Sequence, residues 1–572
     1  MNQLDRPPQQ NWIPHRAPQC LPIGNAHIYP STSLHAVSSS LPTWNSVISW
    51  SEKDKSPLES VEYSYPRFFI SKPLRLLLLR VKERLCISDD DTLGLVFPSA
   101  WVVNLCVETL RLFSPDDHTI QRSVRFVPRD PQDSRTEAAY LAFSVVLFPA
   151  TLKKSAMAVW MDTGAGMSTR HAEYCLEHFE SLVLDAPVSA HENSTGLISI
   201  SADTRIKIQS EHGPQDLHGL ATRIALWTTS EKKDLKPVTA EDVLIFPTGM
   251  NAIFTTSEAL ATLCPETAIV AYGWLYPETV HVLRKSPWER VISFKWGTDE
   301  ELDQLETILK ARPDDISVLF CELPSNIKFI SPNLERIRSL ADTYNFIVAC
   351  DETAANFINV DILPYVDIIM SSLTKMFSGA SDVTGGSVVV NPNSPHHDDI
   401  LRHLRVQYEN VCCFPGDITA LLRNSINMVD RVRTANENAI AVVDLLTGHP
   451  LIAQVNHPSQ GPTFSSYERH RRKNGGYGNI LSVVFHCPES ARIFYDTLDV
   501  CKGSSFGTNF TLVIPYVQLA CYWTQDKCEK YGLPRHILRI SVGLEDRDEI
   551  CGKILLALAA VEASNRGSSY KL

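Results

Sequence analysis

The sequence predicts an α/β protein organised around a large, doubly wound and mostly parallel sheet. Between residues 221 and 400, short apolar runs alternate with helical stretches, which is typical of parallel strands joined by crossover helices. The 572-residue chain is 44% hydrophobic, enough for more than one packed core. One lysine, set among hydroxyl and small residues, lies a few residues after one of the apolar runs. We therefore expect a large sheet domain that carries a small-molecule site, together with smaller domains.

The composition along the chain predicts an arm, an inserted region and two domains. Residues 1–89 are expected to form an N-terminal arm, because their first part is rich in Pro and Ser and poor in long apolar runs. Residues 90–220 contain apolar runs of their own and are interpreted as an inserted α/β region of unknown role. Residues 221–400 are predicted to form the large domain, and residues 401–572 a smaller α+β C-terminal domain.

Charge and cysteine spacing exclude several classes of protein. The formal net charge is −12 and the best basic cluster is RHRRK (469–473), so nucleic acid is not an expected partner. No apolar run reaches the roughly 18 residues of a membrane span and the N-terminus lacks a signal-like apolar segment, so we expect a cytoplasmic protein without a membrane partner. The 14 cysteines include no CxxC pair, so no metal site is expected.

The first predicted strand of the large domain leads into a possible phosphate site. VLIF (243–246) runs into the turn PTGM and then into a helical stretch. The amides of Gly249 and Met250 would therefore lie at a helix N-terminus, where backbone donors and the helix dipole favour an anion. The later apolar runs of this domain are AIVAY (268–272), SVLFC (317–321), FIVAC (346–350) and VDIIM (366–370).

The functional prediction depends chiefly on Lys375. Ser372 and Thr374 precede it, and the small residues of SGASDVTGGS (378–387) follow, so hydroxyls and backbone amides can surround an anion. A lysine held in a half-buried pocket beside a cofactor carbonyl has a lowered pKa, which suits a nucleophile or base. A phosphate beside a reactive amine is the combination that pyridoxal 5′-phosphate requires.

Asp351 meets a second requirement of that cofactor. Its pyridine nitrogen needs a carboxylate partner to stay protonated. Asp351 follows the buried run FIVAC (346–350), at the carboxyl end of a predicted strand. Ligands of open α/β sheets gather at that end, so Asp351 and Lys375 are expected to face one site.

These residues resemble the Cys/Met-metabolism (trans-sulfuration) family of pyridoxal-phosphate enzymes. The matching patterns are Asp351-Glu-Thr353, SLTK (372–375) and SGASDVTGG (378–386). Further blocks are similar to the fungal cystathionine gamma-synthase branch of that family: SLPTW (40–44), YPRFF (65–69), STRHAEYCL (168–176), FPTGMNAI (246–253) and SFGTNFT (505–511). The resemblance implies a fold-type-I pyridoxal-phosphate-dependent transferase with an N-terminal extension, acting on amino acids as a homodimer or homotetramer.

The resemblance also implies roles for residues outside these patterns. Tyr276 matches the aromatic residue that stacks on the pyridine ring, with Tyr272 as the rival candidate. Asn326 in ELPSN matches the residue that hydrogen-bonds the phenolic oxygen of the cofactor. Arg539 matches the arginine that binds the substrate α-carboxylate, and Ser505 lies at a position near that carboxylate. Thr353, in the Asp-x-Thr pattern, is expected to bind the cofactor as well.

Tyr65 and Arg67 match the Tyr-x-Arg pair of the family. That pair reaches across a subunit interface to the cofactor phosphate of a neighbour. Arg67 is also the one formal positive charge that the sequence nominates for a near-dianionic phosphate. The long stretch between Arg67 and Gly249 is the feature that could return the arm to its own chain.

The reaction implied by the resemblance is a γ-replacement on an O-acylhomoserine by cysteine, which gives cystathionine. One alternative is a related enzyme of secondary metabolism that uses another nucleophile, or a C–S lyase that only eliminates. Ile327, Ala380 and Phe506 depart from the residues common in the family and make such divergence plausible. A non-catalytic scaffold is the third reading, and it is disfavoured because the cofactor and substrate residues are all present.

Overall fold

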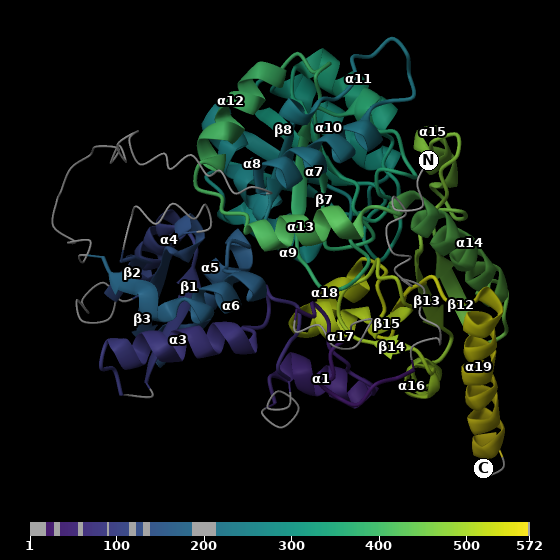
Figure 1. The fold of residues 1–572 in the computed structure, drawn as a ribbon. Helices are drawn as coiled ribbons and strands as arrows, with labels where there is room; N and C mark the ends of the chain where they lie inside the picture. Colours follow the sequence, from purple (N-terminus) through teal and green to yellow (C-terminus); the bar gives the residue numbers. More distant parts are fainter. Residues whose placement is uncertain are drawn as a thin grey trace, which may run out of the picture.

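Three sheets organise the described part of the chain. The computed structural model describes residues 19–27, 35–54, 61–88, 91–113, 122–129, 138–185 and 213–569. Figure 1 shows a small lobe formed by the earlier part of the chain, a large lobe coloured teal and green, and a C-terminal lobe coloured green and yellow. Each lobe is built on one sheet, of four, seven and five strands respectively.

The four-stranded sheet is antiparallel throughout and has the order β1-β3-β2-β4. Its strands are β1 (Thr92–Phe97), β2 (Arg122–Pro128), β3 (Phe143–Pro149) and β4 (Leu182–Leu184). Its helices are α3 (Lys72–Arg84), α4 (Ala100–Phe113), α5 (Lys153–Thr163) and α6 (Thr169–Glu177). Leu74, Leu77 and Val81 of α3 are buried in the same core as the sheet, so this small domain begins within the segment that the sequence analysis assigns to the arm.

The seven-stranded sheet confirms the predicted doubly wound, mostly parallel architecture. Its order is β5-β11-β10-β9-β8-β6-β7. β11 pairs antiparallel with both of its neighbours, while every other pair is parallel. The strands are β5 (Val243–Phe246), β6 (Ala268–Tyr272), β7 (Arg290–Phe294), β8 (Ile316–Glu322), β9 (Ile347–Asp351), β10 (Ile368–Ser371) and β11 (Gly386–Val390).

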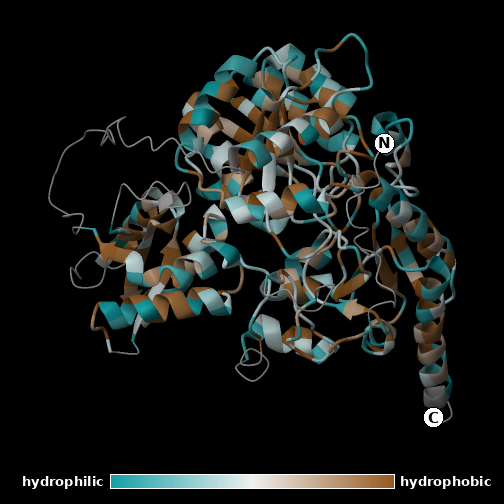
Figure 2. Ribbon diagram, in the orientation of Figure 1, coloured by the Kyte–Doolittle hydropathy of each residue, from teal (hydrophilic) through white to brown (hydrophobic). Residues whose placement is uncertain are grey.

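Helices cover both faces of this sheet, so its strands are apolar on both sides. Along β6, Ala268, Val270 and Tyr272 belong to one core and Ile269 and Ala271 to the other. Figure 2 shows the strands as hydrophobic interior segments, with hydrophilic residues on the covering helices. The helices are α7 (Gly213–Thr228), α8 (Gly249–Leu263), α9 (Pro277–Lys285), α10 (Asp299–Ala311), α11 (Leu334–Tyr344), α12 (His397–Tyr408) and α13 (Pro415–Asn424).

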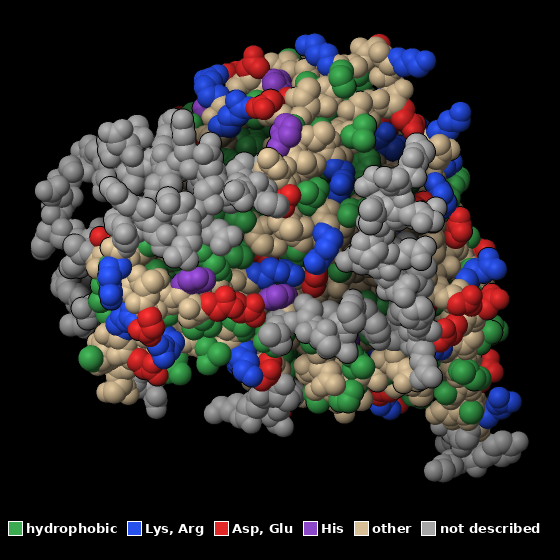
Figure 3. Space-filling view, viewed as in Figure 1, with side chains coloured by type: hydrophobic (Ala, Val, Ile, Leu, Met, Phe, Trp, Pro, Cys, Tyr) green, Lys and Arg blue, Asp and Glu red, His purple; other side chains and the backbone are tan. Residues whose placement is uncertain are grey.

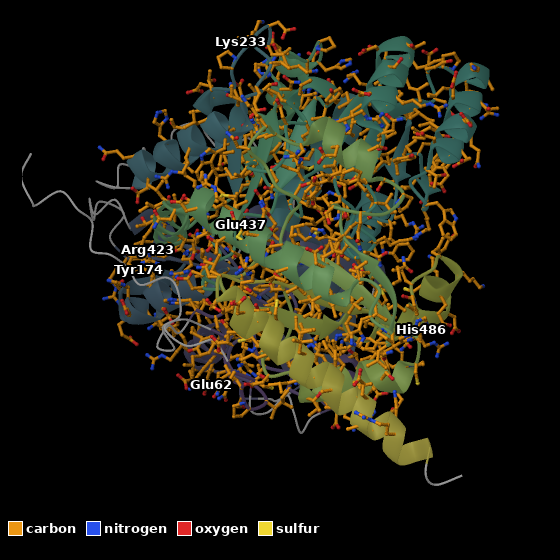
Figure 4. The ribbon with its side chains drawn as sticks, turned by 90° about the vertical axis from the view of Figure 1, so that its right-hand side faces the viewer. Glu62, Tyr174, Lys233, Arg423, Glu437 and His486 are labelled. Atoms are coloured by element: carbon orange, nitrogen blue, oxygen red, sulfur yellow. The ribbon has the colours of Figure 1, made fainter. Side chains whose placement is uncertain are left out.

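The C-terminal lobe packs helices on a five-stranded sheet of order β12-β13-β16-β15-β14. The strands are β12 (Ile452–Asn456), β13 (Ile480–Phe485), β14 (Cys501–Lys502), β15 (Leu512–Pro515) and β16 (Leu538–Ser541). The helices are α14 (Met428–Leu446), α15 (Phe464–His470), α16 (Pro488–Thr497), α17 (Tyr516–Ala520), α18 (Gln525–Lys530) and α19 (Arg547–Ser569). Figure 4 shows α14, on which Glu437 is labelled, running beside α19.

An N-terminal segment docks on this C-terminal lobe. Helix α1 (Trp44–Glu52) buries Trp44 and Val47 in the core formed by α14, α16, α19 and the C-terminal sheet. Leu41 N donates to Lys502 O at 2.8 Å, which ties the segment before α1 to β14. The chain therefore passes from the C-terminal lobe into the small domain before it reaches the large sheet.

The face of the molecule seen in Figure 3 is mixed in charge. Figure 3 shows acidic and basic side chains interspersed over the visible face, without one dominant basic patch. Among the described residues, no helix combines the length and apolarity needed to span a bilayer.

Candidate functional site

Lys375 lies in the turn that follows β10, and it is buried. Its Nζ lies 3.0 Å from Ser505 Oγ and 3.4 Å from Tyr65 Oη. Burial lowers the pKa of Lys375, and the positive charge of Arg539 acts in the same direction against the opposing effect of Tyr65. An amine in this environment is available as a nucleophile and base closer to neutral pH than an exposed lysine.

A buried arginine that the sequence analysis missed holds the turn around Lys375. Arg431 on α14 donates to Met376 O at 2.9 Å and to Phe377 O at 2.7 Å, and a further bond reaches Asn509 Oδ1 at 3.0 Å. Gly507 packs against the same turn, since a Cβ there would lie 2.5 Å from Met376 N. Arg431 lies far from Lys375 in sequence and belongs to no motif, so no local pattern indicated this contact.

The turn after β5 has the features of a phosphate site. Thr248 caps α8, its Oγ1 accepting from Asn251 N at 3.0 Å. Gly249 lies so close to Ser372 that a Cβ on Gly249 would be 2.8 Å from Ser372 Cβ. Ser372 Oγ is buried and has no hydrogen-bond partner among the described residues. An unpaired hydroxyl beside the N-terminal amides of a helix fits an anionic ligand such as a phosphate.

Thr374 supports the glycine-rich segment that follows Lys375. Its Oγ1 donates to Gly385 O at 3.3 Å and accepts from Gly385 N at 3.1 Å. The neighbouring Gly386 is required by close approach, because a Cβ there would lie 2.4 Å from Thr248 O. The contact between Gly386 and Thr248 joins the segment after Lys375 to the turn after β5. These are the two places where the sequence predicts phosphate contacts.

Asp351 ends β9 and is held by Thr353. Its Oδ1 accepts from Thr353 N at 2.9 Å and from Thr353 Oγ1 at 2.5 Å. Thr353 Oγ1 in turn accepts from Ser372 N at 2.8 Å, so Thr353 links the carboxylate to the Lys375 turn. Burial raises the pKa of Asp351, against the lowering effect of the Thr353 bonds and of Lys375. A cation facing this carboxylate, such as a protonated pyridine nitrogen, would favour its ionised form.

Glu322 is a second buried carboxyl group that the sequence analysis did not assign to the site. It pairs with Asp351 across neighbouring parallel strands. Its Oε1 accepts from Tyr276 N at 2.5 Å and its Oε2 from Asn326 N at 3.1 Å. Burial and the charge of Asp351 raise the pKa of Glu322 to about 8. Its place at the end of a strand, first in the ELPSN block, is the signal by which it could have been found.

The buried Arg67 and the partly buried Tyr276 form a hydrogen-bonded pair at the start of α9. Arg67 Nη2 donates to Tyr276 Oη at 2.6 Å, and Arg67 Nη1 lies 3.5 Å from Glu278 Oε2. Burial raises the pKa of Tyr276 above its ordinary value. The rival Tyr272 donates its hydroxyl to Thr298 O at 2.8 Å and packs in a core of the large domain, so Tyr276 is the tyrosine at this site.

Arg539, on β16, joins the C-terminal lobe to the site. Its Nη1 donates to Asn326 Oδ1 at 3.1 Å and its Nη2 to Ser505 O at 2.8 Å. Its Cζ lies 5.0 Å from the ring centroid of Phe506 and 5.1 Å from that of Tyr516. Burial lowers the pKa of this guanidinium. These described partners are neutral, an arrangement that suits an incoming carboxylate.

The origin of Tyr65 and Arg67 differs from the expectation. The family resemblance predicts that they come from a neighbouring subunit, whereas the structure brings both into the site of their own chain, where Tyr65 Oη lies 3.4 Å from Lys375 Nζ. The physical reason is the small domain that follows Arg67, which packs against the large domain of the same chain through α5 and α6. The structure thus brings the sequence-predicted residues together around Lys375.

The pKa of Tyr65 is also shifted by its neighbours in the site. Burial by itself would raise the pKa of Tyr65, but the positive charges of Lys375 and Arg67 outweigh it and lower the pKa. The Nζ of Lys375 lies 4.5 Å from the centroid of the Tyr65 ring. Tyr65 therefore packs its ring against the amine and accepts a hydrogen bond from it.

The chain is similar to known proteins over most of its length. A model of the Cys/Met metabolism PLP-dependent enzyme family matches residues 232–559, and one of the fungal trans-sulfuration enzyme N-terminal domain matches residues 74–168. A cystathionine gamma-synthase-like protein of Aspergillus thermomutatus is 40% identical over 93% of this chain and 94% of its own. A cystathionine gamma-synthase of Neurospora crassa is 30% identical over 94% of this chain and 98% of its own.

A solved structure shares the fold. The crystal structure of cystathionine gamma synthase from Xanthomonas oryzae pv. oryzae, in complex with aminoacrylate and cysteine, superposes with a TM-score of 0.52 at 21% identity. The match covers 61% of this chain and 86% of that chain.

Proposed function

Because the chain belongs to the Cys/Met-metabolism family of pyridoxal-phosphate-dependent enzymes, we propose that it catalyses γ-replacement on an O-acylhomoserine by cysteine, giving cystathionine. The observation that carries the proposal is the buried Lys375, which lies between Ser505 and Tyr65 and has a lowered pKa. The names of the Neurospora and Xanthomonas proteins support the choice of reaction.

The residues present fit the cofactor at each of its polar groups. We assign the phosphate to the amides of Gly249 and Met250 and the hydroxyl of Ser372, because Ser372 Oγ is buried without a partner among the described residues. Thr374 would join them by turning its hydroxyl proton from Gly385 O to the phosphate. Arg67, buried nearby against Tyr276, supplies the positive charge. The cofactor, when bound, supplies a protonated ring that withdraws electrons from the carbon bearing the substrate amine.

The ring contacts follow from the same geometry. Asp351 is the carboxylate for the ring nitrogen, and Thr353 orients it through two bonds to Oδ1. Tyr276 supplies the aromatic face for stacking, and Asn326 supplies an amide for the phenolic oxygen. Glu322 holds both of these residues by accepting their backbone N–H groups.

Proton transfer is the work of Lys375. Its lowered pKa lets the neutral amine take a proton from the substrate α-carbon near neutral pH and deliver one elsewhere on the substrate. Arg539 binds the α-carboxylate bidentately and Ser505 borders it, which fixes the α-carbon relative to Nζ. In the net reaction the Cγ–O bond breaks with loss of a carboxylate, the Cγ–S bond forms, and the thiol proton is released.

A second candidate is a relative that uses another nucleophile, or a lyase that only eliminates. The Aspergillus protein, at 40% identity, carries the name cystathionine gamma-synthase-like. The Phe506 ring lies 4.9 Å from Lys375 Nζ, so this departure from the family borders the space in which a nucleophile must approach. A role as a non-catalytic scaffold does not explain why Lys375 is buried and has a lowered pKa.

The test is product analysis with purified holoenzyme. O-acetyl- and O-succinylhomoserine are supplied in turn, with and without cysteine, and the products are identified by mass spectrometry. We expect cystathionine in the presence of cysteine and none with a Lys375→Ala control. Formation of 2-oxobutyrate and ammonia regardless of the thiol would favour an enzyme that only eliminates, and no conversion of either donor would refute γ-replacement on these donors.

The assembly and location are proposed on the family resemblance. We expect a homodimer or homotetramer in the cytoplasm, which light scattering of the purified protein and microscopy of a tagged chain would measure.

A further inference from the structure

The small N-terminal domain contacts the turn assigned to the cofactor phosphate. Figure 1 shows this lobe beside the large one, and α5 packs against both α8 and α9. At the end of α5, Thr163 O accepts from Asn251 Nδ2 at 2.8 Å, and Gly164 O accepts from Thr248 Oγ1 at 2.9 Å. Thr163 is 1% exposed and Asn251 4%, so these bonds are shielded from water.

These bonds determine how the cap of α8 is oriented. A threonine hydroxyl has one proton, and that of Thr248 is given to Gly164 O. Its oxygen is thereby turned to accept from Asn251 N, which lies one turn into the helix. Gly249 and Met250 lie between Thr248 and Asn251 in the sequence, and their amides point out of the helix N-terminus toward the place where an anion would bind.

Gly164 permits the close approach for two reasons. Its φ is +57°, a conformation that residues with a Cβ adopt with strain. A Cβ at this position would lie 2.5 Å from Thr248 Oγ1 and 2.8 Å from Asn251 N. Any side chain here would push the turn of the small domain away from the start of α8.

The residues just before Gly164 hold two further parts of the site. Met161 O accepts from Arg67 Nη1 at 3.0 Å. Asp162 Oδ2 lies 2.5 Å from Lys285 Nζ on α9, the helix that begins after Tyr276. Four consecutive residues, 161–164, therefore contact the phosphate turn, the buried arginine and α9.

We propose that residues 161–164 are a positioning element for the cofactor phosphate, so that the small domain sets the affinity of the enzyme for pyridoxal phosphate. This inference rests on the phosphate site assigned above. The element acts through Thr248, Asn251 and Arg67 and does not itself touch the cofactor. It gives a role to a domain whose sequence contains no catalytic pattern.

The test compares cofactor affinities of the full-length apoprotein. Pyridoxal 5′-phosphate and pyridoxal, which lacks the phosphate, are titrated while protein fluorescence and visible absorbance are recorded. For Gly164→Ala we expect the dissociation constant for pyridoxal phosphate to rise about tenfold or more, and that for pyridoxal to change less than about twofold. A loss confined to the phosphate ester is not expected from general unfolding of the small domain.

Gly94→Ala is the matched control. The three atoms nearest to its Cβ would belong to Leu78, Leu147 and Val146 of the same small domain, and none of them to residues 161–164. We expect this variant to lower the thermal midpoint and leave both dissociation constants near the wild-type values. Equal loss of pyridoxal phosphate affinity in Gly94→Ala and Gly164→Ala would overturn the proposal.

Two more variants keep the outcome decisive. Asn251→Ala removes the hydrogen bond to Thr163 O without introducing a clash. It replaces Gly164→Ala if that variant does not fold, and we expect it to lose affinity for pyridoxal phosphate but not for pyridoxal. Ser372→Ala tests the phosphate site alone. Wild-type affinity in Ser372→Ala would refute the assigned site and the inference with it. The positioning role alone would be refuted if Ser372→Ala loses affinity for pyridoxal phosphate while Gly164→Ala keeps the wild-type value. If Gly164→Ala does not fold, wild-type affinity in Asn251→Ala has the same meaning.

Discussion

At the scale of single residues, the site is built from buried ionisable groups that shift one another. Lys375 and Tyr65 both have lowered pKa values, and Lys375 Nζ lies 3.4 Å from Tyr65 Oη. Burial raises the pKa of both Asp351 and Glu322, and the charge of Asp351 raises that of Glu322 further. Such perturbed groups in one place are expected of a site that moves protons.

Lys375 is predicted to be the residue that binds the cofactor covalently. The purified holoenzyme should be yellow, and borohydride should link the cofactor to Lys375, as read by peptide mapping. Lys328 is a suitable control, because burial lowers its pKa too but its Nζ bonds Tyr531 O, outside the site. A label that persists in Lys375→Ala, or one lost in Lys328→Arg, would contradict the assignment.

Asp351→Asn is predicted to keep the cofactor and lose most of the turnover. The amide oxygen can still accept the two bonds from Thr353, so the local structure should remain. The negative charge that keeps the ring nitrogen protonated is lost, and we expect kcat to fall by about a hundredfold or more. Steady-state kinetics measures the fall, and near-normal activity would mean that another acid faces the ring.

Arg539→Ala is predicted to weaken binding of the amino-acid donor and leave the cofactor spectrum unchanged. The loss in kcat/KM should correspond to about 2 to 5 kcal/mol, the cost of removing one partner of a buried charge pair. Arg535→Ala is the control, because this exposed arginine is paired with Asp526 and Glu529. Unchanged kinetics of Arg539→Ala with both acylhomoserines would remove Arg539 from the site.

At the scale of elements, strand ends and tight turns place the site. β8 and β9 end side by side at Glu322 and Asp351. The loop after β8 carries Ile327 with φ +82°, which a proline, restricted to φ near −65°, could not adopt. Ser482 Oγ donates to Ile327 O at 2.6 Å and holds this strained position. The family commonly has a proline at this position, so the change to Ile327 goes with a backbone that a proline could not adopt, and Asn326 still reaches Arg539.

The carboxyl pair at the ends of β8 and β9 predicts a pH dependence of the apoprotein. The pKa of Glu322 is about 8 in the folded state against an ordinary value of 4.5, so the folded state binds the extra proton between these values. Its contribution to stability is fully present below pH 4.5 and is lost as the pH rises through about 8.

Glu322→Gln should flatten this decline. Thermal midpoints of wild-type and variant apoprotein are measured from about pH 5 to about pH 9. We expect the wild type to lose more stability than the variant across that range. Parallel curves would show that Glu322 is ionised in the folded apoprotein at every pH tested.

At the scale of the whole molecule, the path of the chain decides whose residues complete a site. The arm first docks on the C-terminal lobe through α1, then passes Tyr65 and Arg67 beside Lys375, and then forms the small domain. The small domain packs on the same large domain, so each site can be complete within one chain even in an oligomer. This arrangement is directly testable with mixed subunits.

Mixing an Arg67→Ala chain with a Lys375→Ala chain is predicted to restore no activity. Each hybrid site would still lack one of its own residues, whereas a site shared between subunits would be rebuilt once per dimer. The control mixes wild-type chains with chains carrying both substitutions, and should retain activity in proportion to the wild-type chains. Activity recovered in the first mixture would show that Arg67 acts on a neighbour.

The sequence by itself determined the sheet, the cofactor and most of the site. Apolar runs that alternate with helical stretches predict β5, β6, β8, β9 and β10, because strands buried on both faces are apolar throughout. The edge strand β7, most of whose residues are only partly buried, was not predicted. Lys375, Asp351 and Ser372 are found because strand ends and short turns bring near neighbours in sequence together. Such local patterns can be recognised in the sequence without knowledge of the tertiary structure.

Only the tertiary structure decided the contacts between distant segments. Arg431 reaches the Lys375 turn from α14, and residues 161–164 reach the phosphate turn from another domain. The resemblance placed Tyr65 and Arg67 on a neighbouring chain and the structure places them on their own, because a motif specifies which side chain binds and not the path by which it arrives. The physical reason is that packing depends on three-dimensional shape, and backbone carbonyls such as Thr163 O and Gly164 O leave no pattern in a sequence.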